Sequence, residues 1–389
     1  MGNLKIDKYL VFALFFALLN MGAIFFIFGF QQYSDSQDYF QTIHWLRGES
    51  PHIDAERALR PLGPILAAPF EFFGEGAGLI VQNLLFYLAS AFLIFRIVEL
   101  LFRNKKQAVL AVMLWVTATP MLEYGLSYLT DTGAWFFYLL SIFLTLLYFY
   151  ARKYSFARNA KPTAYPKLAQ EHSLALPGES IFICVALISS MGVLMKENGS
   201  LGIIFFGMML LLSREFSWTE KILKIIKVGL IFLAPLILFQ LAAYKFFQYT
   251  SLDWYLDNSS GAPGESILLV GLRYLGQLFR ILGIIWPLVL WGLFLEWREK
   301  NWDRLKIYLA LLPPSFSFLL WTVGGGGRTV FIFAPLGIIL ASYALKKRGP
   351  LFLSALFFTI AVLNYWFVSV NQQMPFTDLL YTLLFSKGQ

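Results

Sequence analysis

The stretch that decides the fold is YSDSQDYFQTIHWLRGESPHIDAERALRPLGPILAAP, residues 33–69, which follows the first long apolar run. It is dense in acids, aromatic residues and other polar side chains, where a membrane protein would need only a turn. Asp35 and Asp38 come immediately after the expected membrane boundary. Arg57 and Arg60 lie about two helical turns before the next apolar run. We interpret this stretch as the catalytic loop of a membrane enzyme.

The composition of the whole chain predicts an integral membrane protein. Of its 389 residues, 58% are hydrophobic and 14% are charged, whereas soluble domains carry about 25% charged residues. The apolar runs recur along nearly the whole length, which predicts one membrane domain over residues 1–389. The single cysteine, Cys184, can form no disulfide within the chain.

The formal net charge of +8 could indicate nucleic-acid binding, but the distribution of the charges favours a membrane protein. Most Lys and Arg residues gather in clusters that alternate with loops poor in bases, which is the positive-inside pattern. The clusters are Lys5 and Lys8, Arg103–Lys106, Arg152–Lys167, Arg214–Lys227, Arg298–Lys306 and Lys346–Arg348. We therefore expect a cytoplasmic N-terminus and an external first loop, in a plasma (inner) membrane and without a nucleic-acid partner.

The apolar runs predict an all-α polytopic bundle of about 11 transmembrane helices. The expected spans are residues 9–30, 79–102, 108–122, 132–150, 181–195, 201–212, 228–247, 281–297, 307–323, 329–345 and 351–370. The first span lacks the short core and cleavage site of a signal peptide, so we expect a retained anchor. External segments are expected at 31–78, with short interfacial helices, at 249–280, with an interfacial helix, and at 371–389, the tail.

Counting spans places ionisable residues from four loops at the same external face. They are Asp35, Asp38, Arg57, Arg60, Glu123, Asp131, Lys196, Glu197 and Arg328. Charges of both signs near a membrane are costly, and such a set predicts a functional site. Acids and bases at the mouth of an apolar bundle suit a lipid substrate with an anionic head, whose phosphate the cations would hold.

Four short motifs resemble those of the GT-C glycosyltransferases that use polyprenyl-phosphate sugars, a group that includes protein O-mannosyltransferases and the aminoarabinose transferase. DSQDY at 35–39 with WLRG after it is similar to their first-loop signature, and RALRPLGP at 57–64 to their segment before the second span. TDTGAWF at 130–136 is similar to their second external acid, LMKENG at 194–199 to their short-turn lysine, and GGR before Pro335 to their late Arg-to-Pro stretch. The resemblance covers the first half and one later turn.

The resemblance implies an inverting glycosyltransferase that moves a sugar from a polyprenyl-phosphate donor to a hydroxyl or amine on a lipid, glycan or protein. One carboxylate would take the acceptor's proton, and we expect Asp35 in that role. Cations would stabilise the phosphate leaving group, and Arg60, Lys196 and Arg328 are the candidates, followed by Arg57. Asp131 would orient the acceptor, or share a Mg²⁺ or Mn²⁺ ion with Asp35. Tyr39, Asp38 and Glu197 complete the candidate substrate-binding set.

Several of these residues have simpler interpretations. Asp38 and Asp131 could be helix caps, Arg57 and Arg60 could reach to lipid phosphates, and Lys196 could pair with Glu197. Arg96 and Glu99, three residues apart, predict an ion pair on one helix face.

Two other functions are compatible with a polytopic chain. A transporter or lipid flippase would carry charges near mid-membrane and show inverted repeats, and neither pattern is visible in this sequence. A non-catalytic scaffold would leave the external polar set without a purpose.

Overall fold

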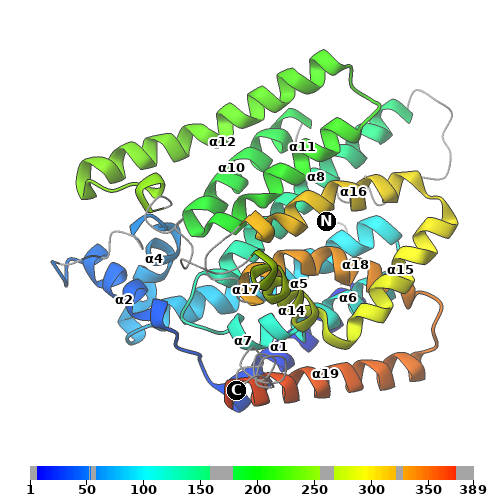
Figure 1. Ribbon diagram of the computed structural model, residues 1–389, viewed down its shortest axis with the longest axis horizontal. Helices are drawn as coiled ribbons and strands as arrows, with labels where there is room; N and C mark the ends of the chain where they lie inside the picture. Colours follow the sequence, from blue (N-terminus) through cyan, green and yellow to red (C-terminus); the bar gives the residue numbers. More distant parts are fainter. Residues whose placement is uncertain are drawn as a thin grey trace, which may run out of the picture.

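The chain folds as a bundle of helices, and the predicted all-α class is confirmed (Figure 1). The computed structural model describes residues 7–51, 53, 58–157, 178–254, 267–320 and 327–373. Within these ranges no strand forms, and a single isolated bridge joins Gln31 to Ser127.

The helices of the first half are α1 (Lys8–Phe28), α2 (Ser34–Leu46), α4 (Leu62–Ala67), η1 (Ala68–Phe73), α5 (Ala77–Phe102), α6 (Lys105–Val116), α7 (Thr119–Tyr124) and α8 (Asp131–Ala157). The chain continues with α10 (Gly178–Met195), η2 (Glu197–Leu201), α11 (Gly202–Leu212) and α12 (Trp218–Phe247). The last part holds α14 (Ile267–Leu282), η3 (Gly283–Ile285), α15 (Trp286–Glu299), α16 (Trp302–Phe316), η4 (Ser317–Leu320), α17 (Gly327–Val330), η5 (Phe331–Phe333), α18 (Ala334–Ala344) and α19 (Pro350–Gln373).

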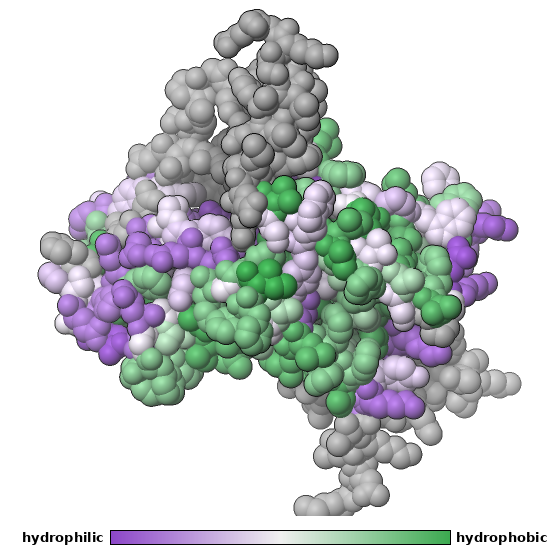
Figure 2. Space-filling model, turned by 90° about the horizontal axis from the view of Figure 1, so that it is seen from below, coloured by the Kyte–Doolittle hydropathy of each residue, from purple (hydrophilic) through white to green (hydrophobic). Residues whose placement is uncertain are grey.

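The two ends of the bundle differ in composition. The turns after α5, α11, α15 and α18 carry the predicted basic clusters and lie toward the right of Figure 1, and we call this the basic end. The helices α2 and α4 lie at the opposite end, which we call the site end. Figure 2 shows hydrophobic residues across the middle of the molecule and hydrophilic residues gathered at both ends, as in a protein that crosses a membrane.

Four of the helices that start at the basic end begin with a polar cap. The side chains of Asp7, Asn104, Ser217 and Asn301 accept hydrogen bonds from the backbone N–H groups that open α1, α6, α12 and α16. Such caps satisfy donors that have no partner inside the helix. The predicted ion pair between Arg96 and Glu99 is confirmed at this end, with 2.7 Å between Nη1 and Oε2.

Within the described residues, six helical segments are long and apolar enough to cross a membrane, at residues 8–28, 77–102, 131–151, 218–247, 274–299 and 351–370. The other expected spans coincide with shorter helices, so the total of about 11 stays a prediction. The helix α12 begins at Trp218, ten residues earlier than the span predicted from 228, because a capping box of Ser217 and Glu220 starts it there.

One further expectation about the helices was wrong. The span expected over 108–122 is divided, because α6 ends at Val116 and α7 begins at Thr119 with Pro120 in its first turn, where proline is tolerated. The helix α14 buries only part of its apolar side chains. Leu278 and Leu282 are buried, whereas Phe279 is exposed.

The break between α6 and α7 leaves two carbonyl groups without partners in their own helix. The Asn20 amide of α1 donates to Val116 O at 2.8 Å, and the Asn364 amide of α19 donates to Thr117 O at 2.8 Å. The Tyr87 hydroxyl accepts a second hydrogen bond from Asn20 at 2.8 Å. Unpaired backbone groups are costly away from water, so two outer helices supply the amides that permit this break.

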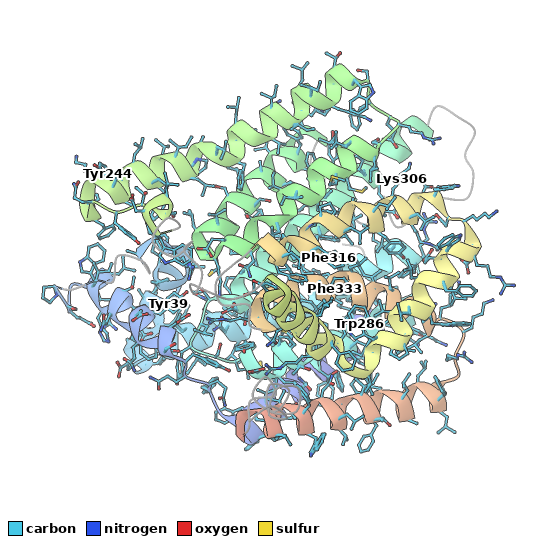
Figure 3. All side chains as sticks on the ribbon, in the orientation of Figure 1. Tyr39, Tyr244, Trp286, Lys306, Phe316 and Phe333 are labelled. Atoms are coloured by element: carbon cyan, nitrogen blue, oxygen red, sulfur yellow. The ribbon has the colours of Figure 1, made fainter. Side chains whose placement is uncertain are left out.

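The helix α18 forms the centre of the second half, since every residue from Ala334 to Ala344 is buried. It packs against α15 and α6. At its start, Phe333 contacts Trp286 of α15 and Phe316 of α16, each with 5.4 Å between ring centroids (Figure 3). This aromatic contact fixes the segment that carries Arg328.

Replacing Asn20 with Leu is expected to lower the free energy of unfolding by about 1–3 kcal/mol, because Val116 O loses its main donor in a buried position. Reversible denaturant unfolding in mixed micelles measures this change. Thr359→Val is the control, because the Thr359 hydroxyl bonds only to Ala355 O of its own exposed helix. Equal effects of the two substitutions would contradict this account of the helix break.

Candidate active site

The start of α2 places Asp35 at the site end. Tyr33 is the residue before the helix, and its N–H donates to the Ser36 hydroxyl at 2.9 Å. Tyr128 N–H donates to Gln31 O at 3.0 Å, and the Tyr33 hydroxyl donates to Glu123 O at 3.0 Å. These contacts hold the first loop against the segment that leads into α8, so Asp35 lies beside the start of α8.

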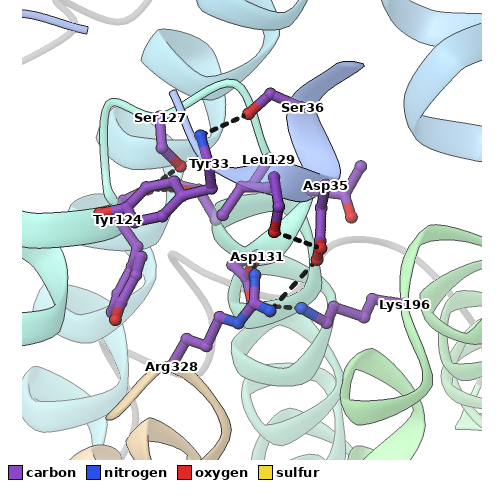
Figure 4. Close-up of polar contacts among 12 residues, drawn as sticks. Tyr33, Asp35, Ser36, Tyr124, Ser127, Leu129, Asp131, Lys196 and Arg328 are labelled. Carbon is purple, nitrogen blue, oxygen red and sulfur yellow. Dashed lines mark hydrogen bonds and ion pairs between the residues drawn. The ribbon is translucent and has the colours of Figure 1, made fainter. Parts of the chain in front are cut away.

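Asp131 is the first residue of α8, and its side chain is 1% exposed. Lys196 Nζ lies 2.6 Å from Asp131 Oδ1. Arg328 Nη1 lies 3.8 Å from Asp131 Oδ2, and Arg328 Nη2 lies 3.1 Å from Asp35 Oδ2. Figure 4 shows the two carboxylates and the two cations converging from four separate segments of the chain. We call Asp35, Asp131, Lys196 and Arg328 the charge cluster.

Glycines bring the lysine turn close to α10. A Cβ on Gly192 would lie 2.4 Å from Gly199 O, so only glycine permits this approach. Gly199 N–H donates to Lys196 O at 2.8 Å, which closes the turn. Gly63 of α4 has a similar role, since a Cβ there would lie 2.4 Å from Thr130 Cγ2. The glycines of LMKENG and RALRPLGP therefore position the charge cluster by close packing.

A second ion pair lies next to the charge cluster. Arg60 Nε donates to Glu197 Oε1 at 2.7 Å, and the Arg60 guanidinium lies 5.4 Å from the ring centroid of Trp254. The Tyr39 hydroxyl is 2.9 Å from the Thr130 hydroxyl, one residue before Asp131. Burial raises the pKa of the Glu197 carboxyl, but the charge of Arg60, the hydrogen bonds to the carboxylate and the charge of Lys196 together hold that pKa below its ordinary value.

The positions of the other candidates decide between the simpler interpretations. Asp38 is not a helix cap, because it lies in the second turn of α2 and Tyr33 stands at the cap position. Lys196 and Glu197 bond to Asp131 and Arg60 instead of to each other. Arg60 is buried and therefore does not reach out to lipid phosphates. Arg57 lies outside the described residues.

One buried ion pair near the site was not expected from the sequence. Arg280 of α14 pairs with Glu123 of α7, and their side chains are 11% and 9% exposed. Burial, then the charge of Glu123, raises the pKa of the nearby Tyr33 phenol above its ordinary value, so this hydroxyl stays a hydrogen-bond donor. An arginine within an apolar helix signals a buried partner, but the sequence does not say which acid it is.

A metal ion shared by Asp35 and Asp131 would have to displace the Arg328 guanidinium from its present contacts. The Arg328 guanidinium lies between the two carboxylates. Among the described residues, no group of three or more His, Cys, Asp or Glu side chains is placed to hold a metal ion. In this structure the cation that joins the two acids is thus part of the chain.

Comparisons with known proteins support the fold. No family model and no curated protein matches the sequence. The structure is similar to the crystal structure of the oligosaccharyltransferase of Archaeoglobus fulgidus in its apo form, with a TM-score of 0.56 and 12% sequence identity. The match covers 94% of this chain and 56% of that one, so this chain spans little more than half of that enzyme's length. At this identity the likeness concerns the fold alone, and this chain folds as the matched part of that oligosaccharyltransferase does.

Replacing Lys196 with Met is expected to lower the free energy of unfolding by about 3 kcal/mol, because the buried Asp131 carboxylate loses its closest cation. Adding Asp131→Asn should restore part of the loss, since the uncompensated charge is then gone. Denaturant unfolding in mixed micelles measures both changes. Lys306→Met is the matched control, because its pair with Asp303 is partly exposed at 3.7 Å and worth less than about 1 kcal/mol. A double variant that is no more stable than Lys196→Met would refute this view of the cluster.

Proposed function

We propose that this chain is an inverting glycosyltransferase that uses a polyprenyl-phosphate sugar. It would transfer the sugar to a hydroxyl or amine of a lipid, glycan or protein acceptor at the external face of the plasma membrane. The observation that carries this proposal is the charge cluster at one end of an apolar GT-C-like bundle. In the charge cluster, Asp35 pairs with Arg328, which also lies beside the buried carboxylate of Asp131.

The chemistry of sugar transfer needs a base and a stabilised leaving group. Asp35 is 20% exposed at its side chain, which leaves it open to an acceptor. Its carboxylate takes the proton of the acceptor as the acceptor attacks the anomeric carbon. The bond between that carbon and the phosphate oxygen breaks on the opposite side, so the configuration inverts. Negative charge then develops on the departing polyprenyl phosphate.

Arg328 and Lys196 are placed to stabilise that charge. Both are held in position by Asp131 before the substrate binds, so little reorganisation is needed during the reaction. The Arg328 guanidinium has further donors beyond the one that it gives to Asp35, and a planar fork suits phosphate oxygens. Phosphate competes with Asp35 for this guanidinium, which leaves the Asp35 carboxylate available to the acceptor.

Arg60 and Glu197 belong to the phosphate side of the proposed site. Their ion pair fixes the turn that carries Lys196, since Glu197 is the next residue. Tyr39 holds the first loop against Thr130, beside Asp131. Asp38, in the second turn of α2, and Arg57, which lies outside the described residues, complete the proposed substrate-binding set. Trp254, over Arg60, begins the external loop that we assign to the acceptor.

The donor's tail would lie along the apolar helices, in the lipid. The helix α12 offers such a surface, because nearly all of it faces away from the bundle and its leucines at 230, 238 and 241 are exposed. Its C-terminal end leads directly to Trp254, which contacts Arg60. A tail along α12 would thus place the phosphate at the site end.

Replacing Asp35 with Asn is expected to reduce transfer by about 10²–10⁴-fold, because the variant keeps the shape of the side chain but removes the base. The assay is transfer from a panel of radiolabelled polyprenyl-phosphate sugars by the purified full chain in membranes. Glu49→Gln is the control, since Glu49 is a loop acid that pairs with His44 and Arg47 away from the cluster. Donor binding is measured in parallel. Wild type that neither binds nor transfers any donor would remove the proposal.

Chelation is a separate test of how the two acids are neutralised. Because Arg328 lies between Asp35 and Asp131, we expect transfer by the wild type to persist in EDTA. Activity that is lost in EDTA and restored by Mg²⁺ or Mn²⁺ would show that a metal ion displaces Arg328 in the working enzyme.

A further inference from the structure

A polar pocket opens at the basic end, far along the bundle from the charge cluster. It has a volume of about 310 Å³ and is formed by the turn between α5 and α6, the junction of α15 and α16, and the end of α18. Its polar lining includes Asn104, Gln107, Glu299, Arg304, Lys346 and Lys347. The proposed transfer reaction uses none of these residues.

Two acids, the buried Glu296 and the exposed Glu299, pair with two of the pocket's cations. Arg304 Nε donates to Glu296 Oε2 at 2.9 Å, and Arg304 Nη2 lies 3.0 Å from Glu299 Oε2. Lys346 also pairs with Glu299. The Tyr343 ring lies 4.8 Å from the Arg304 guanidinium and 3.9 Å from Lys346 Nζ. A ligand that enters this pocket therefore meets cations that are already ordered.

The pocket keeps one cation without an acidic partner. The side chains of Arg304 and Lys346 are 17% and 19% exposed and are balanced by Glu296 and Glu299. Lys347 is exposed and makes no ion pair with any residue in the described part of the chain. The excess of positive charge favours an anion, and the amide side chains of Asn104 and Gln107 add hydrogen-bonding groups.

Two tryptophans mark the depth of the pocket in the membrane. Trp297 near the end of α15 and Trp302 at the start of α16 are 74% and 70% exposed, on either side of the turn that leads to Arg304. Exposed tryptophans at the ends of membrane helices lie at the level of the lipid headgroups. The pocket therefore opens where lipid phosphates are found.

We propose that this pocket binds the phosphate of an anionic phospholipid headgroup, with Lys347 as its free cation and Arg304 and Lys346 as ordered neighbours. Basic pockets between helices at a membrane surface have the chemistry that anionic headgroups need. The site is independent of the proposed transferase activity. Because it joins α5, α15, α16 and α18, a bound headgroup would also stabilise the basic end.

The test uses the purified full chain in nanodiscs of phosphatidylcholine. Phosphatidylglycerol is added in increasing amounts, and native mass spectrometry measures the lipid that stays bound. Lys347→Glu is compared with Arg214→Glu, which makes the same change in net charge at the same end but outside the pocket. Lys347→Gln removes the charge without reversing it and serves if the Glu variant does not fold. Inorganic phosphate at millimolar concentration is the competing soluble anion.

We expect wild type to retain phosphatidylglycerol in preference to phosphatidylcholine. Lys347→Glu should lower that retention at least about fivefold, as expected for one basic side chain near an anionic lipid, while Arg214→Glu matches wild type. Equal losses in the two Glu variants would mean attraction to the whole surface and would overturn the proposal. Displacement of the lipid by inorganic phosphate would assign the pocket to a soluble phosphate compound instead.

Discussion

The buried carboxylate of Asp131 is the constraint around which the site end is arranged. A charge that is 1% exposed must be compensated by partners, or its desolvation would outweigh the gain from folding. Asp131 has two cationic neighbours, Lys196 from the turn after α10 and Arg328 from the start of α17. Arg328 in turn reaches Asp35 of the first loop. One buried acid thus determines how four distant segments meet.

A second constraint acts inside the bundle, where the backbone itself must be satisfied. The helical segment from 105 to 124 is interrupted between α6 and α7. Because of this break, α7 places Glu123 and Tyr124 beside the first loop. The interruption would be unfavourable in lipid without the amides of Asn20 and Asn364. These two asparagines come from opposite ends of the sequence, so the break depends on packing of α1 and α19 against the centre. Features of the site end therefore rest on contacts deep in the bundle.

Much of the fold could be predicted, because the membrane imposes a simple rule on sequence. Apolar runs located the long helices, and in the described residues the turns after α5, α11, α15 and α18, which carry basic clusters, lie at the end opposite α2 and α4. The partners within the site could not be predicted in the same way. Lys196 and Glu197 are adjacent in sequence, yet they bond to Asp131 and Arg60 because the backbone of the turn sends their side chains in different directions. Similarly, Arg280 was visible as a charge in an apolar helix, but its pairing with Glu123 depends on the divided helix that the hydropathy pattern concealed.

The connection between the two ends runs through α18. From Arg328 to Lys346 the chain passes along α17, η5 and α18, a helical path of roughly 27 Å at 1.5 Å per residue. Its central helix is buried on every side, so it has no free face along which to slide or tilt. Its first turn is fixed by Phe333 between Trp286 and Phe316, and its last by Tyr343 against Arg304 and Glu299. A rigid, enclosed helix therefore joins the two ends of the bundle and fixes the position of the Arg328 guanidinium relative to the basic end.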